Sequence, residues 1–147
     1  MSNAKPINWR VTIAAAGMVM LAVAASAGSA IAADIKVTLD GAQEVPPVST
    51  SAKGEGMITV NDDKSLSGSV TTTGVDATMA HIHHGAPGKN GPIIVPFEKK
   101  SDGEWAVPAN SSFTDEQYKA YQAGELYVNV HSAEHKGGEI RGQLMPK

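Results

Sequence analysis

The chain has 147 residues, a formal net charge of −3 and no cysteine. Without cysteine there is no disulfide, no catalytic thiol and no thiolate metal ligand, so a metal would have to be held by histidine, carboxylate, methionine or backbone oxygen. With 15 acidic residues against 12 basic ones, the chain carries no electrostatic footprint for DNA or RNA. Nucleic acid is therefore excluded as a partner.

The first 33 residues have the layout of a secretory signal peptide. Lys5 and Arg10 give a positive start, residues 11–27 form an apolar run, and small residues follow in the pattern that a signal peptidase accepts. The apolar run is shorter than the about 20 residues of a membrane helix and is diluted by alanine, so we expect cleavage and no stable membrane insertion afterwards. We predict a signal peptide at residues 1–33, one domain at residues 34–147, and a periplasmic or secreted location.

Short strands separated by turns dominate the rest of the chain. Residues 35–39 alternate apolar and polar side chains with the period of a half-buried strand. Pro46 and Pro47 exclude a helix and a central strand at that point and favour an extended edge or loop. Further strands are predicted at residues 56–60, 66–72, 79–83, 93–97, 125–130 and 139–144, and Trp105 begins or ends another.

One helix is predicted, at residues 115–123. Thr114 can cap its first turn with Gln117 as the partner of a capping box, and Gly124 is placed to end it. About six to eight short strands, with turns every ten or so residues, indicate an antiparallel architecture. The predicted fold class is all-β: an antiparallel Greek-key-like β-sandwich or barrel with one short helix, preceded by the signal peptide.

Three of the five histidines fall within the segment HIHHG, residues 81–85. Because side chains alternate across a strand, Ile82 belongs to the core and His81 and His83 point outward together. His84 then faces the other way or enters the turn. Residues two apart on a strand have Cβ atoms about 6 to 7 Å apart, so two imidazoles can converge on one ion.

A third ligand must come from another strand. In LYVNVH the alternation buries the leucine and valines and turns His131 outward, which makes it the best candidate to complete a trigonal or tetrahedral shell. His135 in the following loop, or Met79 on the outward face beside His81, would be an additional ligand. The same histidines can instead be ordinary surface or turn residues, since a lone His-x-His pair is a weak motif.

Four separated motifs follow one another within residues 35–144: LDGAQEVPPV, LSGSV, MAHIHHGAPGKNGPIIVPF and GELYVNVHSAEHKGGEIRGQL. Together they resemble the CHRD domain, which is named for its repeats in chordin and occurs singly in many exported bacterial proteins. The resemblance covers nearly all of the mature chain. It implies an extracytoplasmic all-β domain but fixes no biochemical activity.

A second resemblance, to the copper site of copper-zinc superoxide dismutases, concerns four residues. Those Greek-key sandwiches carry a His-x-His pair, a later histidine and an arginine beside the copper, which match His81 and His83, His131, and Arg141. The dismutase disulfide cannot form here, and no bridging histidine or zinc-binding carboxylate cluster is recognisable. The resemblance therefore leaves a copper-only site open rather than a full copper-zinc site.

Three functions follow from these patterns. The first is an exported protein that binds a metal ion through the outward histidines, with copper favoured over zinc because imidazole-rich sites bind Cu(II) tightly. The second is a dismutase-like oxidoreductase in which Arg141 draws superoxide toward the copper. The third is a metal-free module that binds an envelope or extracellular protein.

Overall fold

The structure is a computed structural model that describes residues 32–147. Of the predicted signal peptide, residues 1–31 lie outside the described residues, while Ala32 and Ala33 begin the first strand. The signal peptide and its cleavage therefore stay predictions. None of the helices in residues 32–147 is long or apolar enough to span a lipid bilayer.

Nine strands, one α-helix and the short 3-10 helix η1 (Gly41–Gln43) are the regular elements of residues 32–147, and they confirm the predicted fold class. Every predicted strand is present within a few residues of its expected bounds. The strand β6 was not predicted, because its residues EKKS are all exposed and show no apolar alternation. The strands are β1 (Ala32–Asp40), β2 (Lys53–Asn61), β3 (Leu66–Thr73), β4 (Ala77–His84), β5 (Ile93–Pro96), β6 (Glu98–Ser101), β7 (Glu104–Ala106), β8 (Leu126–Ser132) and β9 (Ile140–Leu144).

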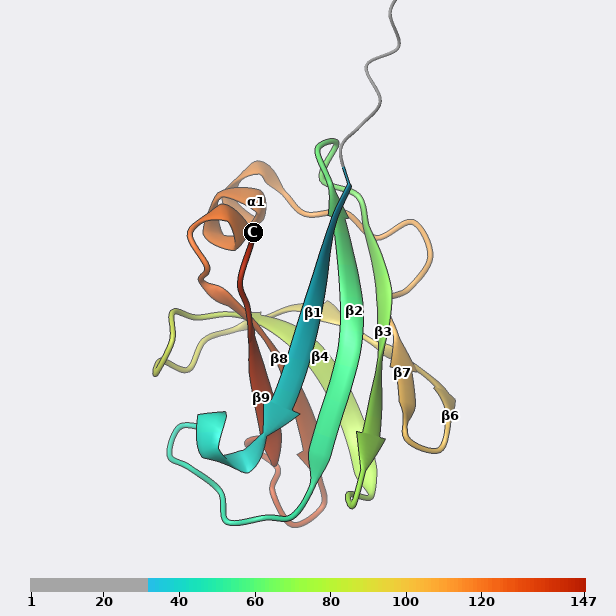
Figure 1. Cartoon of the computed structure of the whole chain (residues 1–147), viewed down its shortest axis with the longest axis vertical. Coiled ribbons are helices and arrows are strands. Elements are labelled where there is room, and N and C mark those ends of the chain that lie inside the picture. The colour runs from blue at the N-terminus through green and yellow to red at the C-terminus, as the bar shows by residue number, and fades with distance from the viewer. Residues whose placement is uncertain (1–31) are drawn as a thin grey trace, which may run out of the picture.

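The strands form one antiparallel sheet in the order β5-β4-β8-β9-β1-β2-β3-β7-β6 (Figure 1). The two end strands, β5 and β6, are consecutive in the chain and are separated only by Phe97. The backbone N–H of Phe97 donates to the carbonyl of Ala80 at 2.9 Å, which ties this link to β4. Because the chain itself joins the two ends, the sheet is rolled into a nearly closed barrel.

The barrel interior is the hydrophobic core, and strand alternation supplies it as expected. Ile82 on β4 and Val128 on β8 are fully buried opposite each other in the ladder. The remaining large buried apolar side chains come from the strands, the covering helix and the segments next to them: Ile35, Val37, Leu39, Ile58, Val60, Leu66, Val70, Val95, Phe97, Trp105, Val107, Phe113, Tyr121, Leu126, Val130, Ile140 and Leu144.

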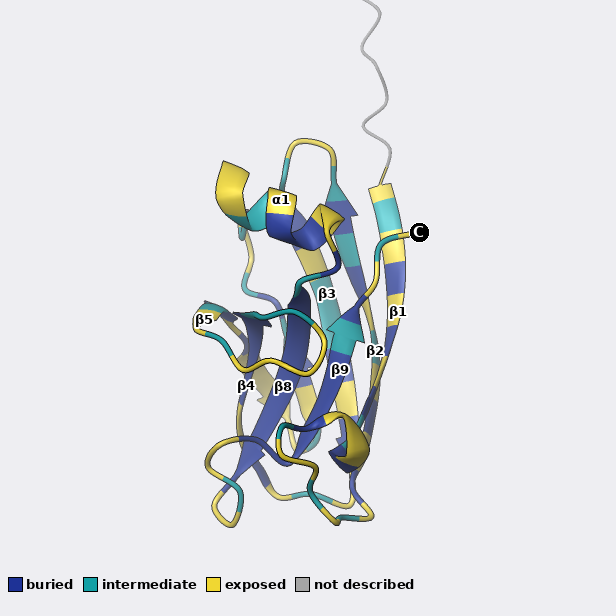
Figure 2. Cartoon of the chain, turned by 90° about the vertical axis from the view of Figure 1, so that its left-hand side faces the viewer, coloured by how far each residue is buried: buried dark blue, intermediate teal, exposed yellow. Residues whose placement is uncertain are grey.

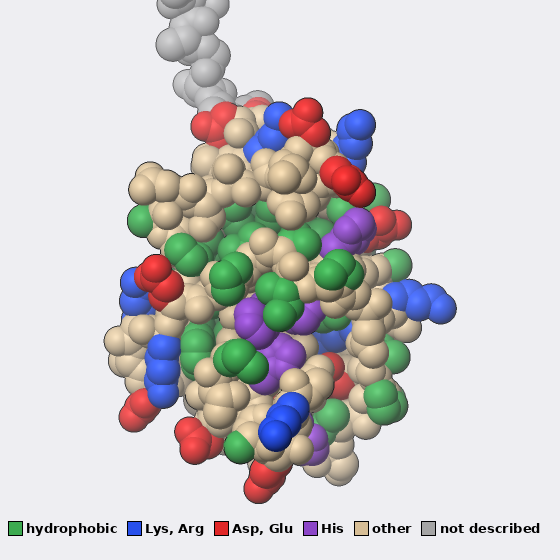
Figure 3. Space-filling view, turned by 180° about the vertical axis from the view of Figure 1, so that it is seen from behind, with side chains coloured by type: hydrophobic (Ala, Val, Ile, Leu, Met, Phe, Trp, Pro, Cys, Tyr) green, Lys and Arg blue, Asp and Glu red, His purple; other side chains and the backbone are tan. Residues whose placement is uncertain are grey.

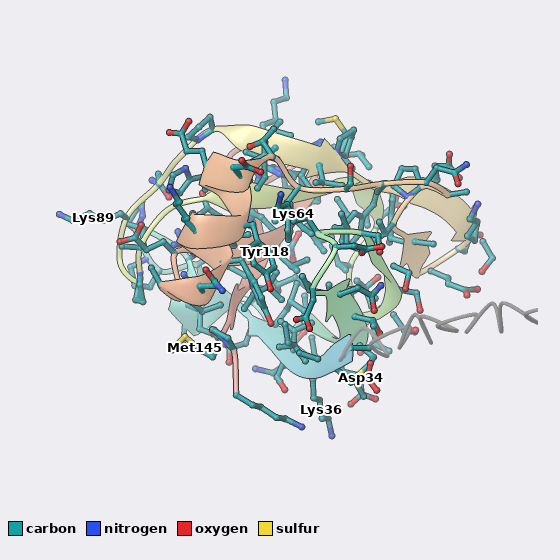
Figure 4. The ribbon with its side chains drawn as sticks, turned by 90° about the horizontal axis from the view of Figure 1, so that it is seen from above. Asp34, Lys36, Lys64, Lys89, Tyr118 and Met145 are labelled. Carbon is teal, nitrogen blue, oxygen red and sulfur yellow. The ribbon has the colours of Figure 1, made fainter. Side chains whose placement is uncertain are left out.

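The helix α1 (Asp115–Gln122) covers one end of the barrel. Thr114 accepts from the backbone of Gln117, whose side chain accepts from the backbone of Thr114, so the predicted capping box is present. Gly124 has a φ of +72° just beyond the helix, a conformation in which glycine is unstrained. Figure 4 shows α1 across this end, with Tyr118 on the side that packs against the core.

Three loops cover the outer face of β4, β8 and β9: residues 41–52, 85–92 and 133–139. All seven residues of β8 are buried, which requires cover on both faces (Figure 2). The amide of Asn90 donates to the carbonyl of Val45 at 2.8 Å, so two of these covering loops are joined. His81, His83 and His131 lie on the face away from the core, as predicted, and the loops bury them there.

Candidate metal centre

Three histidines meet on the covered face, two from β4 and one from β8. His81 and His83 are two residues apart on β4, and His131 lies on the neighbouring antiparallel strand. Their exposed fractions are only 7%, 7% and 5%. One ring nitrogen from each lies within 4.8 Å of those of the other two. The fold therefore brings together the three histidines that were predicted to bind one ion.

Backbone carbonyls set the tautomers of two of these rings. The Nδ1 of His83 lies 2.9 Å from the carbonyl oxygen of Gly91, and the Nδ1 of His131 lies 2.9 Å from that of Lys136. A carbonyl can only accept, so both Nδ1 atoms carry the proton and both Nε2 atoms keep a free lone pair. This is the arrangement typical of metal-binding histidines, whose second nitrogen donates to a backbone oxygen or carboxylate.

The free lone pairs point toward the space between the three imidazole rings. The Nε2 of His131 lies 3.1 Å from the Nδ1 of His81. The Nε2 of His83 is buried and has no hydrogen-bond partner among residues 32–147. A buried polar atom without a partner costs about 1 to 3 kcal/mol, so such atoms are rare unless a function retains them.

Burial also keeps the imidazoles uncharged. Burial, together with the neighbouring His131 and His83, lowers the pKa of His81 to about 4. Burial lowers the pKa of His83 and of His131 as well, although the carbonyl that each ring faces opposes the shift. Neutral imidazole is the form that binds a metal ion, so near pH 7 no proton has to leave a cationic ring first.

The other predicted ligands occupy different positions. Met79 pairs with His131 across the ladder and is 49% exposed, so it lies at the solvent side of the same face. His135 is partly exposed in the 133–139 loop and is not part of the three-histidine group. His84 turns away, and its Nε2 lies 3.7 Å from a carboxylate oxygen of Glu125. The ligand roles of Met79 and His135 stay predictions, and His84 was not predicted to be a ligand.

Arg141 is tied to the 85–92 loop rather than open to solvent. It is 1% exposed, and its guanidinium donates to the carbonyls of Lys89 (2.6 Å) and Ala86 (3.4 Å) and to the amide oxygen of Asn90 (3.2 Å). Its Cζ also lies 3.4 Å from the ring centroid of Tyr127. The guanidinium therefore holds this covering loop on the sheet.

Glu44 is a buried neighbour of the centre that the sequence reasoning did not single out. It comes from the 41–52 loop, is 5% exposed, and accepts from the side-chain amide of Asn129. Burial raises its pKa to about 7, while Asn129 and the positive charge of Arg141 oppose the shift. The motif QEVPPV, where an acid stands in an apolar and proline-rich run, is the signal that could have identified it.

Glu44→Gln is expected to flatten the pH dependence of stability. The pKa of Glu44 is about 7 in the folded chain and 4.5 ordinarily, so the folded state binds the proton more tightly than the unfolded state does. This stabilisation is complete below pH 4.5, falls as the pH rises, and is lost above pH 7. Between pH 5 and pH 8 the wild type should lose roughly 2 kcal/mol more stability than the variant. Urea unfolding at the two pH values measures this, and parallel pH profiles would contradict it.

Comparison with known proteins identifies a family. The model of the CHRD domain matches residues 35–144, which is the segment that carries the four motifs. No curated protein and no solved structure gives a significant match to the chain.

Proposed function

The chain belongs to the CHRD domain family, and on that premise we propose that it is an exported protein, periplasmic or secreted, that binds a copper ion through His81, His83 and His131. The observation that carries the proposal is the unpartnered, buried Nε2 of His83, which faces two further imidazoles. A metal ion would give this atom the partner that no residue supplies.

The spacing of the donor atoms suits this role. Metal–nitrogen bonds of about 2.0 Å place the nitrogens of a tetrahedral or trigonal site about 3.3 to 3.5 Å apart. The observed 3.1 Å between His81 Nδ1 and His131 Nε2 is close to this value. In the metal-free protein the Nδ1–H of His81 donates to the Nε2 of His131. A metal ion bound to the Nδ1 of His81 therefore requires that this ring carries its proton on Nε2 instead. Copper is favoured over zinc because it binds imidazole donors more tightly.

Metal titration of the purified chain tests the proposal. We expect one copper ion per chain in the wild type and at least a roughly 100-fold weaker affinity in His83→Ala and in His131→Ala, since each removes one of three ligands. His84→Ala is the matched control, because His84 lies next to the cluster on β4 but outside it. Circular dichroism establishes that the variants fold, and unchanged affinity in both ligand variants would refute the metal centre.

The dismutase-like alternative gains no support from Arg141. Its guanidinium is buried and its hydrogen bonds go to the 85–92 loop, so it is not presented to an incoming anion. Binding is therefore the function that the geometry supports best.

A further inference from the structure

The predicted ligands of the metal centre carry no negative charge that would offset the charge of a bound ion. The three-histidine group found in residues 32–147 includes no carboxylate, so its ligands contribute no negative charge. Glu44 bonds to Asn129 instead. A buried ion keeps a large desolvation cost unless an opposite charge compensates it, and this cost rises steeply with the charge of the ion.

A fixed positive charge lies behind one of the ligands. The ring of Tyr127 stacks on His83, with centroids 4.9 Å apart and planes within 8° of each other. The guanidinium of Arg141 lies over the ring of Tyr127. Since arginine stays protonated in proteins, it opposes each additional positive charge bound at His83.

The rim of the centre is apolar and contains a thioether. In the ladders of β4, Met79 stands opposite His131, and Ile93 stands opposite His83, so these side chains share the histidines' face. Met79 is 49% exposed and Ile93 is 52% exposed. Figure 3 shows histidine side chains in the middle of this side of the molecule, surrounded by hydrophobic ones.

We infer that the centre selects monovalent copper, Cu(I), over Cu(II) and Zn(II), and that the sulfur of Met79 is its additional ligand. This inference rests on the proposed function and specifies which ion it concerns. Cu(I) brings one charge rather than two and prefers soft donors such as a thioether, whereas Cu(II) prefers a tetragonal set of nitrogen and oxygen ligands. Met79 flanks His81 along β4 and His131 across the ladder, so it is on the histidines' face and next to two of the three ligands.

Competitive titration without oxygen tests the selectivity. Cu(I) is supplied from its complex with the chromogenic chelator bicinchoninate in the presence of a reductant, and Cu(II) and Zn(II) are titrated separately. We expect Cu(I) to bind at least about 100-fold more tightly than either divalent ion and to displace Zn(II) from the loaded chain.

Met79→Leu tests the thioether while preserving the size of the side chain. It should weaken Cu(I) binding about tenfold, leave Zn(II) binding unchanged, and remove the sulfur neighbour from the copper X-ray absorption spectrum. Met57→Leu is the matched control, because Met57 is 46% exposed but lies on β2, away from the centre.

The outcomes separate this inference from the proposed function. Zn(II) or Cu(II) binding as tight as that of Cu(I) would overturn the selectivity, and an unchanged sulfur signal in Met79→Leu would overturn the role of Met79, in both cases with the three-histidine site intact. If no ion binds the wild type, the proposed function itself fails.

Discussion

Replacing Gly142 by alanine is expected to lower the free energy of unfolding by about 3 to 5 kcal/mol. A Cβ at this position would lie 2.4 Å from the carbonyl oxygen of Thr38 and 2.8 Å from Cγ2 of Val37. The oxygen belongs to the backbone of β1, which neighbours β9 in the sheet, so no side-chain rotation relieves the contact. The two strands would have to separate.

The β1–β9 contact is a sensitive point because it joins the β5-β4-β8-β9 half of the sheet to the β1-β2-β3-β7-β6 half. Within residues 32–147, Asp40 and Arg141 are the one pair of residues that face each other in the β1–β9 ladder. Few ladder hydrogen bonds therefore resist the separation of these two strands. Gly137→Ala is the matched control, since a Cβ there meets nothing within 4 Å. Urea unfolding of both variants measures the difference, and Gly137→Ala should change the free energy of unfolding by less than about 0.5 kcal/mol. Equal losses in the two variants would show that the close approach of β1 to Gly142 does not cause the destabilisation.

Strand alternation was sufficient to predict which strand residues face the core and which histidines face away from it. In β8 it separates Val128 and Val130 from His131, and in β4 it separates Ile82 from His81 and His83. These are local consequences of the two-residue period of a strand, so they can be read from a short segment of sequence. The capping box at Thr114 is local in the same sense.

The environment of the histidines could not be predicted in the same way. Alternation assigns a side chain to a face but does not say what covers that face. The carbonyl of Lys136 is near His131 in the chain, but Glu44 meets Asn129 across 85 residues of sequence. Such contacts depend on how loops of irregular backbone fold back over the sheet, and no periodic pattern records this. The burial of the site, its lowered pKa values and the role of Arg141 are therefore visible only in the structure.

Arg141→Met is expected to lower the free energy of unfolding by about 2 to 4 kcal/mol and to loosen the 85–92 loop. Methionine keeps most of the buried apolar stem but removes the donors to the carbonyls of Ala86 and Lys89 and to the side chain of Asn90. It also removes the cation that lies on Tyr127, a contact worth up to about 2 kcal/mol when it is shielded from water. Arg141→Lys keeps the charge without the planar fork, so we expect it to recover only part of the loss.

The same substitution should reach the metal centre through the loop. The carbonyl of Gly91 orients His83. Arg141 donates to Lys89 and Asn90, which directly precede Gly91 in the chain. We therefore expect faster amide hydrogen exchange in residues 85–92. We also expect a net, about tenfold weaker metal affinity, because the loss of a partner that orients a ligand outweighs the relief of the repulsion between Arg141 and the ion. Lys89→Met is the control: its side chain projects into solvent (Figure 4), while its carbonyl stays available to Arg141. If Arg141→Met unfolds more easily but its folded form binds the ion as tightly as the wild type does, Arg141 stabilises the fold without positioning His83.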